Sequence, residues 1–308
     1  MDKIRQFLDK NNFEFCENFD ISNISSIKLG NIAKLVIFPK CEYELEKLLI
    51  FFYTTKIKYL IFGNLSNVLF VNTIICPVIV TCKMNEELKI SNGLVSVSAG
   101  MLLPKFCEQM RKNKLSGVEG LIGIPATIGG AIKNNAGAYG FSISDRLVKI
   151  RVFYDGKIFD LLKSEIKFAH HFSNLDGFVI LQATFLFENK NEYDIINLSN
   201  EFTYLRGKSQ PTGLSLGSVF KKVNSRSAGF YIERSGLKGL REGGIVVSSK
   251  HSNFFVNDKN GSVSDFLRLM ATVQSQVEKQ FGVCLVPEIE KVGDFNETFG
   301  RFAYTFEI

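Results

Sequence analysis

The sequence predicts an α+β fold with two or three subdomains. Segments whose apolar residues have helical spacing alternate with short β-rich runs in both halves of the chain. The chain has 308 residues, of which 45% are hydrophobic and 22% are charged. This composition is globular, and the length allows about two domains. No repeat of 20–50 residues is present, which excludes solenoids and propellers.

The first part of the chain mixes helices with short strands. The apolar residues of 42–53 have helical spacing, so this segment predicts a helix. The runs 58–63, 77–81 and 94–100 are short and apolar, which is typical of strands. Residues 103–114 predict another helix, which ends where the sequence "LSGVEGL" begins.

A hairpin and a core-facing strand are predicted in the middle of the chain. The run "LVKIRVFYDGKIFDLL" (147–162) predicts a β-hairpin with Asp-Gly (155–156) as its turn. Residues 177–188 predict a strand that faces the core. The polar, helical stretch 189–213 then ends in a Pro/Gly loop. This shift in composition predicts a domain boundary near residue 200.

The C-terminal part repeats the mixture of helix and strand. Residues 227–239 predict a helix closed by Gly236 or Gly239, because glycine tolerates the left-handed conformation found at helix ends. A strand is predicted over 243–248.

The strongest helix prediction covers 262–282. We expect Ser264 as its N-cap and Asp265 in its first turn, where a carboxylate complements the helix dipole.

The cysteines and histidines predict no metal site. Zinc requires clustered ligands, and only three histidines could join the scattered cysteines. No CxxC pair occurs, so we expect reduced, mostly buried thiols in a cytosolic protein. The residues concerned are Cys16, Cys41, Cys76, Cys82, Cys107, Cys284, His170, His171 and His251.

The charge distribution predicts neither a nucleic-acid nor a membrane partner. The net charge of +6 is spread along the chain, whereas nucleic-acid binders concentrate their basic residues on one face. An anionic small ligand would fit this excess equally well. The N-terminus is charged and amphipathic, unlike a signal peptide, and apolar runs such as 48–53 are too short to span a bilayer. We expect a cytoplasmic protein.

Two stretches of small residues predict a phosphate-binding surface. In "GIPATIGGAIKNNAGAYG" (123–140), small residues before a helix would leave N–H groups pointing outward to phosphate. The alternative is tight helix–strand packing with a glycine hinge. The run "FGNLSNVLF" (62–70) could form a second phosphate-facing turn, or a plain polar turn.

Five motifs in order give the chain its resemblance to a known family. They are "GNLSN", "GIPATIGGAIKNNAGAYG", "GSVFK", "AGFYIERSGLKGLREGGIVVSSKHSNFFVN" and "GVCLVPEIEKVG", and they run from about residue 25 to 293. This order resembles the UDP-N-acetylenolpyruvoylglucosamine reductases of bacterial cell-wall synthesis. The resemblance implies an FAD-binding domain of the vanillyl-alcohol-oxidase type over 1–200, with subdomains of about 1–73 and 74–200. A substrate-binding domain follows over 201–308.

The resemblance also implies the cofactors and the reaction. NADPH would reduce FAD, and the flavin would pass hydride from N5 to an enol ether on a nucleotide sugar, in a monomeric oxidoreductase acting on a CH–CH group. The residues implied to hold FAD are Gly63, Asn64, Ser66, Asn67, Pro125, Thr127, Gly129, Gly130, Asn135, Ala136, Gly137 and Ala138.

The catalytic residues implied by the resemblance are a hydroxyl and a carboxylate. Ser218 matches the proton donor of the family, and Glu288 matches the carboxylate that assists protonation. Glu290, two residues further on, is the residue most easily confused with Glu288. The residues implied to bind substrate are Tyr139, Arg206, Gln210, Lys221, Lys250 and Asn253, while His251 is expected in packing or ligand contact.

Several positions depart from the family pattern. His171 stands where the family has a catalytic arginine, and an imidazolium there could supply the positive charge. Leu65 replaces the second glycine of the "GxGSN" turn, Ala126 replaces a glycine, and 28–31 lack the arginine and a glycine of "RxGG". The short span from His171 to Ser218 predicts the shorter kind of family member, without the loop that carries a substrate-closing tyrosine.

Two other functions remain open. A non-catalytic homologue could keep the fold and bind flavin or a nucleotide sugar after losing the catalytic arginine. A flavin oxidase acting on another alcohol or sugar is disfavoured by the paired "GSVFK" and "LVPE" motifs, which such an enzyme does not need.

Overall fold

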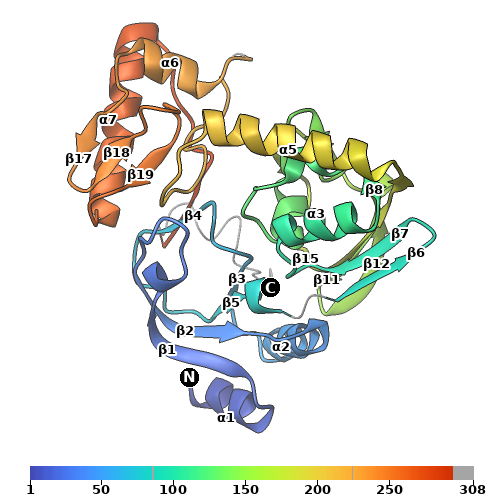
Figure 1. The fold of residues 1–308 in the computed structure, drawn as a ribbon. Helices are drawn as coiled ribbons and strands as arrows, with labels where there is room; N and C mark the ends of the chain where they lie inside the picture. Colours follow the sequence, from blue (N-terminus) through green and yellow to red (C-terminus); the bar gives the residue numbers. More distant parts are fainter. Residues whose placement is uncertain (85–86, 224, 294–308) are drawn as a thin grey trace.

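The computed structural model describes residues 1–84, 87–223 and 225–293. Its main elements are a four-stranded, a five-stranded and a three-stranded sheet, each with its own helices (Figure 1). Several two-stranded pairs lie outside these sheets. The predicted α+β class is confirmed.

The four-stranded sheet lies near the N-terminus and has the strand order β1-β2-β5-β3. β1 pairs antiparallel with β2, whereas β2, β5 and β3 are parallel. Helices α1 and α2 share a hydrophobic core with it, because both present apolar residues at helical spacing. The bounds are α1 (Asp2–Lys10), β1 (Glu14–Asp20), β2 (Ile32–Phe38), α2 (Glu42–Thr54), β3 (Leu60–Phe62) and β5 (Val78–Val80).

The five-stranded sheet is antiparallel and has the order β12-β11-β15-β7-β6. The predicted hairpin is confirmed: Asp155 (φ 46°) and Gly156 (φ 73°) form a turn with two positive φ angles between β11 and β12. Helices α3 and α4 contribute to its core. The bounds are β6 (Leu88–Ser91), β7 (Leu94–Ser98), α3 (Leu103–Lys112), α4 (Ile128–Lys133), β11 (Leu147–Tyr154), β12 (Lys157–Leu162) and β15 (Val179–Leu186).

Helix α5 (Glu192–Ser209) leads from this sheet toward the C-terminal part (Figure 1). It runs without a break through residue 200, near which the sequence predicts a domain boundary, and that division remains a prediction. The short antiparallel pairs are β8 (Leu115–Ser116) with β16 (Glu188–Asn189), β9 (Gly137–Ala138) with β10 (Phe141–Ser142), and β13 (Phe168–Ala169) with β14 (Phe172–Ser173).

The C-terminal part packs two helices on the sheet β17-β18-β19. Helix α6 ends at Gly236 (φ 71°), one of the two predicted closing glycines. The last described strand pairs in parallel with β4, so the chain returns to the region of the first turn of small residues. The bounds are β4 (Val68–Phe70), α6 (Ala228–Arg234), β17 (Arg241–Glu242), β18 (Ile245–Val247), β19 (Phe255–Asn257), α7 (Val263–Phe281) and β20 (Glu290–Val292).

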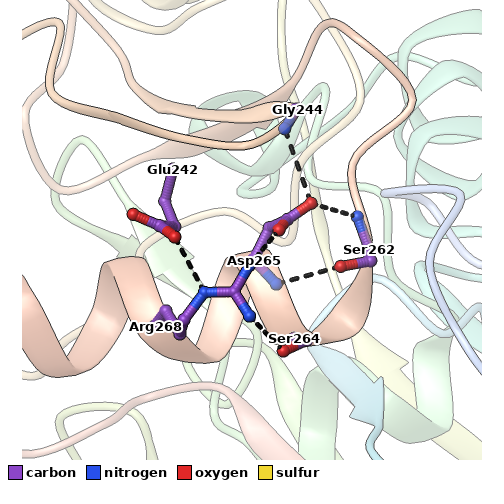
Figure 2. Close-up of polar contacts among 6 residues, drawn as sticks. All are labelled: Glu242, Gly244, Ser262, Ser264, Asp265 and Arg268. Carbon is purple, nitrogen blue, oxygen red and sulfur yellow. Dashed lines mark hydrogen bonds and ion pairs between the residues drawn. The ribbon is translucent and has the colours of Figure 1, made fainter.

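The start of α7 corrects the predicted cap. Ser262, not Ser264, is the N-cap: its hydroxyl accepts a hydrogen bond from the Asp265 N–H at 3.1 Å, and the Asp265 carboxylate accepts one from the Ser262 N–H at 2.8 Å (Figure 2). This reciprocal arrangement is a capping box. The Ser264 hydroxyl instead accepts a hydrogen bond from Arg268 at 2.6 Å.

Replacing the two serines separately tests this assignment. Ser262→Ala removes the cap and is expected to lower the free energy of unfolding by about 1 kcal/mol. Ser264→Ala removes only an exposed contact with Arg268 and is expected to cost less than about 0.5 kcal/mol. Urea unfolding of the two variants makes the comparison. A larger loss in Ser264→Ala would contradict the assignment.

The prediction of mostly buried cysteines is wrong. Only Cys107 is buried, four others are half-buried and Cys284 is exposed; all six are unpaired. Burial raises the pKa of the Cys107 thiol to about 12. Within the described part of the chain, no cluster of three His, Cys, Asp or Glu side chains could hold a metal ion. None of the described helices combines the length and the apolar character that crossing a bilayer requires.

Candidate active site

The two stretches of small residues lie against each other. Gly63 begins the turn between β3 and β4, and a Cβ there would lie 2.2 Å from the Thr127 hydroxyl oxygen. The Asn64 side chain donates a hydrogen bond to the Pro125 carbonyl at 2.9 Å. The structure therefore brings the residues predicted to hold FAD at 63–67 into contact with those at 125–127.

The 63–67 turn keeps a left-handed backbone without its second glycine. Leu65 has φ 51° and is only 2% exposed, because its side chain packs into the core beneath the turn. The N–H groups of residues 64–67 have no hydrogen-bond acceptor among the described residues. These donors are the kind of group that binds phosphate oxygens.

The start of α4 contradicts one expectation. The N–H groups of Ile128 and Gly129 donate to the carbonyls of Met101 and Ala99, each at 2.8 Å. The Gly130 N–H donates to the Thr127 hydroxyl at 3.2 Å. The expectation that these groups point outward to phosphate is therefore wrong. At Gly129 the missing Cβ permits a close approach to Ala99 instead.

The second half of the glycine-rich stretch forms a tight hairpin. Tyr139 (φ 53°) and Gly140 (φ 83°) are the two turn residues between β9 and β10. A Cβ on Gly137 would lie 2.8 Å from the Phe141 carbonyl oxygen. Close packing of the chain on itself, the alternative considered from the sequence, thus explains the small residues at Gly129 and Gly137.

Asn135 retains an unsatisfied group that fits a polar ligand. It is 7% exposed, and its side-chain nitrogen donates to the Ala169 carbonyl at 2.8 Å. Its side-chain oxygen is buried and accepts no hydrogen bond from the described residues. A buried polar atom without a partner costs about 1–3 kcal/mol, so a donor from a bound group is favoured here. Together with the free N–H groups of 64–67, it fits a cofactor that carries phosphates and ring donors.

The proposed catalytic carboxylate lines a small pocket. The pocket has a volume of about 110 Å³ and lies between the β13–β14 hairpin, the 287–290 segment, Asn67 and Lys221. Glu288 faces His171 across it, with 3.9 Å between His171 Nδ1 and Glu288 Oε1. Glu290, the residue most easily confused with Glu288 in the sequence, lines the same pocket.

The surroundings of this pair shift both pKa values. Burial raises the pKa of Glu288 to about 7, and Lys221 and Lys222 oppose this shift. The His171 side chain is 36% exposed, but burial of the remainder lowers its pKa, and so do His170 and Lys222. Since the ordinary histidine value already lies below 7, the structure favours a neutral His171 at neutral pH. The imidazolium considered from the sequence is therefore disfavoured.

Ser218 lies on the segment next to Glu288. The Glu288 N–H donates to the Val219 carbonyl at 2.8 Å, and Phe220 pairs with Pro287 in an antiparallel bridge. Ser218 is half-buried and follows Gly217, whose φ of 76° requires the left-handed region. The hydroxyl does not line the pocket with Glu288. The backbone of the Ser218 segment thus lies next to that of Glu288.

Three residues predicted to bind substrate form one cluster. Arg206 donates to the Gln210 side chain at 3.1 Å, and its guanidinium lies 5.5 Å from the centre of the Tyr139 ring. Burial lowers the pKa of Arg206, and its Nε is buried without an acceptor among the described residues. Lys250 donates to the Gly207 carbonyl beside this cluster.

The other two predicted substrate residues lie on the Glu288 side. Lys221 lines the pocket. Asn253 is 5% exposed, and both polar atoms of its amide bond the backbone of Phe220, at 2.9 and 3.0 Å. It thereby fixes the segment that carries Ser218. His251 packs against Phe254, with 4.6 Å between ring centres.

Sequence reasoning gave no role to two lysines near this pocket. Lys133, the single charge in the glycine-rich stretch, lines it and pairs with Asp176 at 2.7 Å. Lys222 follows Lys221 and acts electrostatically on His170, His171 and Glu288. The sequence signals were the isolated charge among small residues and the doubled lysine after "GSVF".

Known proteins match both parts of the chain. A family model described as FAD binding domain matches residues 33–161, and one described as UDP-N-acetylenolpyruvoylglucosamine reductase, C-terminal domain, matches residues 210–292. The UDP-N-acetylenolpyruvoylglucosamine reductase of Caldicellulosiruptor saccharolyticus is 34% identical over 299 residues, 95% of this chain and 96% of that protein. The protein of that name from Enterococcus faecalis is 32% identical over 278 residues, 89% of this chain and 93% of its own.

A solved structure agrees with these sequence matches. The crystal structure of UDP-N-acetylenolpyruvylglucosamine reductase from Thermus caldophilus superimposes with a TM-score of 0.78 and 29% identity. The match covers 91% of this chain and 98% of that chain.

Proposed function

Because the chain belongs to the UDP-N-acetylenolpyruvoylglucosamine reductase family, we propose that it reduces UDP-N-acetylglucosamine enolpyruvate to UDP-N-acetylmuramate. NADPH is the proposed reductant, and the reaction belongs to the synthesis of peptidoglycan precursors. FAD is its cofactor, in keeping with the FAD-binding domain over 33–161. The observation that carries the proposal is the meeting of Glu288, His171 and the Ser218 segment beside the 63–67 turn.

The cofactor would be held mainly by the 63–67 turn and by Asn135. The free N–H groups of the turn suit phosphate oxygens, and the unpaired Asn135 oxygen suits a ring donor. When bound, FAD supplies the hydride chemistry that side chains cannot perform. Gly129 and Gly130 would contribute close packing around the site rather than N–H donors.

Two groups of this chain would handle the proton. Reduction of the alkene places negative charge on the carbon beside the substrate carboxylate, and that carbon must then receive a proton. Ser218 is proposed as the donor through its hydroxyl. Glu288, with a pKa of about 7, can hold a proton near neutral pH and would assist this step.

The substrate is proposed to bind through the cationic and aromatic cluster near the end of α5. Arg206, held by Gln210 and stacked over Tyr139, offers a fork-shaped donor to diphosphate oxygens. Lys250 adds positive charge beside this cluster, and Lys221 adds it at the Glu288 pocket. The enzyme is proposed to act as a monomer in the cytoplasm, and six unpaired cysteines are typical of such a reducing compartment.

Flavin content and turnover test the proposal together. The purified protein is expected to be yellow and to oxidise NADPH only when UDP-N-acetylglucosamine enolpyruvate is present. A folded protein that stays colourless after incubation with FAD would contradict the proposal. Thermal stabilisation by FAD and by the nucleotide sugar without any NADPH oxidation would instead support the non-catalytic homologue.

A further inference from the structure

We propose that Lys133 is a positioning residue, which holds the hairpin that carries His171 against the pocket of Glu288. The expected effect on turnover rests on the proposed function. Lys133 is the single charged residue of the glycine-rich stretch 123–140, and it lines the pocket together with His171 and Glu288. The motif comparison leaves this lysine without a role.

The hairpin of β13 and β14 has few bonds of its own to fix it. Each strand has two residues, and the turn between them consists of His170 and His171. His171 has φ 51°, in the left-handed region that residues other than glycine seldom occupy. Two-stranded hairpins are at best marginally stable in water by themselves. The position of His171 therefore depends on bonds from outside the hairpin.

Lys133 provides such bonds at the end of α4. Its ammonium donates to the Leu175 carbonyl and to the Asp176 carboxylate, each at 2.7 Å. Its own backbone carbonyl accepts a hydrogen bond from the Ser173 hydroxyl at 2.6 Å. Ser173 and Leu175 are both buried, so water competes little for these bonds. Lys133 thus fixes the chain that leaves the turn.

The strand before the turn is bonded to the same stretch of chain. The Asn135 side chain donates to the Ala169 carbonyl at 2.8 Å. Residues 133–135 therefore bond the hairpin on both sides of its two histidines. Because the Gly129 N–H of α4 donates to the Ala99 carbonyl directly after β7, this attachment extends to the five-stranded sheet.

The hairpin forms one wall of the pocket around Glu288, through His171, Phe172 and Ser173. Burial is the main cause of the raised pKa of Glu288 and of the lowered pKa of His171. If the hairpin moved away, both groups would gain water, and both pKa values should return toward their ordinary values. The other titratable side chains that line the pocket are Lys133, Asp176, Lys221 and Glu290, while His170 and Lys222 act on His171 electrostatically.

The test uses the FAD-loaded enzyme and three variants. Lys133→Met removes the ammonium and keeps an unbranched stem, whereas Lys133→Arg keeps donors for both the carbonyl and the carboxylate. Lys167→Met is the matched control, because Lys167 directly precedes β13 and its exposed side chain has no hydrogen-bond or ion-pair partner among the described residues.

The expected effect is on kcat at neutral pH. We expect kcat to fall about 10- to 100-fold in Lys133→Met, because a small displacement of a reacting group costs this much. It should return to within about 5-fold of wild type in Lys133→Arg and stay unchanged in Lys167→Met. A wild-type kcat in Lys133→Met would overturn the inference. If Lys133→Met does not fold, Lys133→Gln replaces it in every measurement, with the same criteria.

The pH profile of kcat separates positioning from a purely electrostatic role. Loss of a positive charge alone would raise the pKa of Glu288, whereas release of the hairpin is expected to lower it from about 7 toward 4.5. Since the protonated acid is the proposed active form, the fall of kcat with rising pH should begin at a lower pH in Lys133→Met. A profile that is unchanged or shifted to higher pH would contradict positioning.

Hydrogen exchange of the 166–176 backbone does not depend on turnover. Exchange in this segment is expected to be at least about 10-fold faster in Lys133→Met than in wild type, and unchanged in Lys133→Arg and Lys167→Met. Equal exchange in Lys133→Met and wild type would show that the lysine does not hold the hairpin. A wild-type enzyme that binds FAD but never turns over would refute the proposed function, and hydrogen exchange would still decide the role of Lys133.

Discussion

The variant Glu288→Gln is expected to lose kcat by a factor of about 10²–10⁴ while keeping its bound flavin. The amide has nearly the same shape as the carboxyl group but cannot act as an acid or a base in the reaction. The substitution leaves the bond from the Asn67 side chain to the Glu288 carbonyl in place, and the Glu288 side chain faces His171, so flavin content should not change. Steady-state NADPH oxidation and the flavin absorption of the purified variant measure the two quantities.

Glu290→Gln is the matched control, because Glu290 lines the same pocket two residues away. Its kcat is expected to fall by less than about 10-fold. If Glu290→Gln were the inactive variant and Glu288→Gln retained turnover, the assignment of the two carboxylates would have to be exchanged.

The same Glu288→Gln variant should show a distinct pH dependence of stability. The folded pKa of Glu288, about 7, lies above the ordinary value of 4.5, so the folded state binds its proton more tightly than the unfolded state does. Its contribution is therefore fully present below pH 4.5 and is lost as the pH rises through 7. As the pH rises from 4.5 to 7, the free energy of unfolding of the wild type should fall by on the order of 2 kcal/mol relative to that of Glu288→Gln. Urea unfolding across this range makes the measurement; parallel curves would contradict the raised pKa.

The second large effect is expected at the contact between the two FAD-binding stretches. Gly63→Ala places a Cβ 2.2 Å from the Thr127 hydroxyl, which caps α4. Either Thr127 or the 63–67 turn must move, so we expect a loss of about 1–3 kcal/mol in stability and a large loss of bound flavin. Flavin content per protein and the unfolding midpoint in urea are the measurements.

Gly207→Ala is the control for this substitution. Gly207 lies inside α5, its φ is not in the left-handed region, and no atom lies within 4 Å of an added Cβ. Alanine there should raise stability by up to about 1 kcal/mol because it favours the helix. A Gly63→Ala protein that bound FAD as wild type does would remove the 63–67 turn from the proposed site.

The elements could be predicted from local pattern, because their apolar spacing and turn residues agree with the final fold. The Asp-Gly turn at 155–156 is the clearest instance. The cap of α7 could not be placed in the same way. Ser262 and Ser264 both suit an N-cap, and the choice depends on where the Asp265 carboxylate finds its N–H donors.

The site could be predicted only in part, because its chemistry depends on contacts between distant segments. The sequence 123–140 does not show that the N–H groups at the start of α4 are taken by Ala99 and Met101. The replacement of an arginine by His171 is visible in the sequence, but the lowered pKa of His171 depends on burial and on the nearby His170 and Lys222. Conversely, Leu65 keeps the left-handed turn because its side chain packs into the hydrophobic core beneath it.

The pairing of β20 with β4 has a consequence for how the protein is made. The Asn67 side chain donates to the Glu288 carbonyl across 221 residues of chain, and the Glu290 N–H donates back to Asn67. A ribosome must therefore have translated almost all of the described chain before the 63–67 turn can contact the Glu288 segment. Until then one edge of the FAD site is incomplete. Flavin binding is therefore expected to follow translation of the chain and not to accompany it.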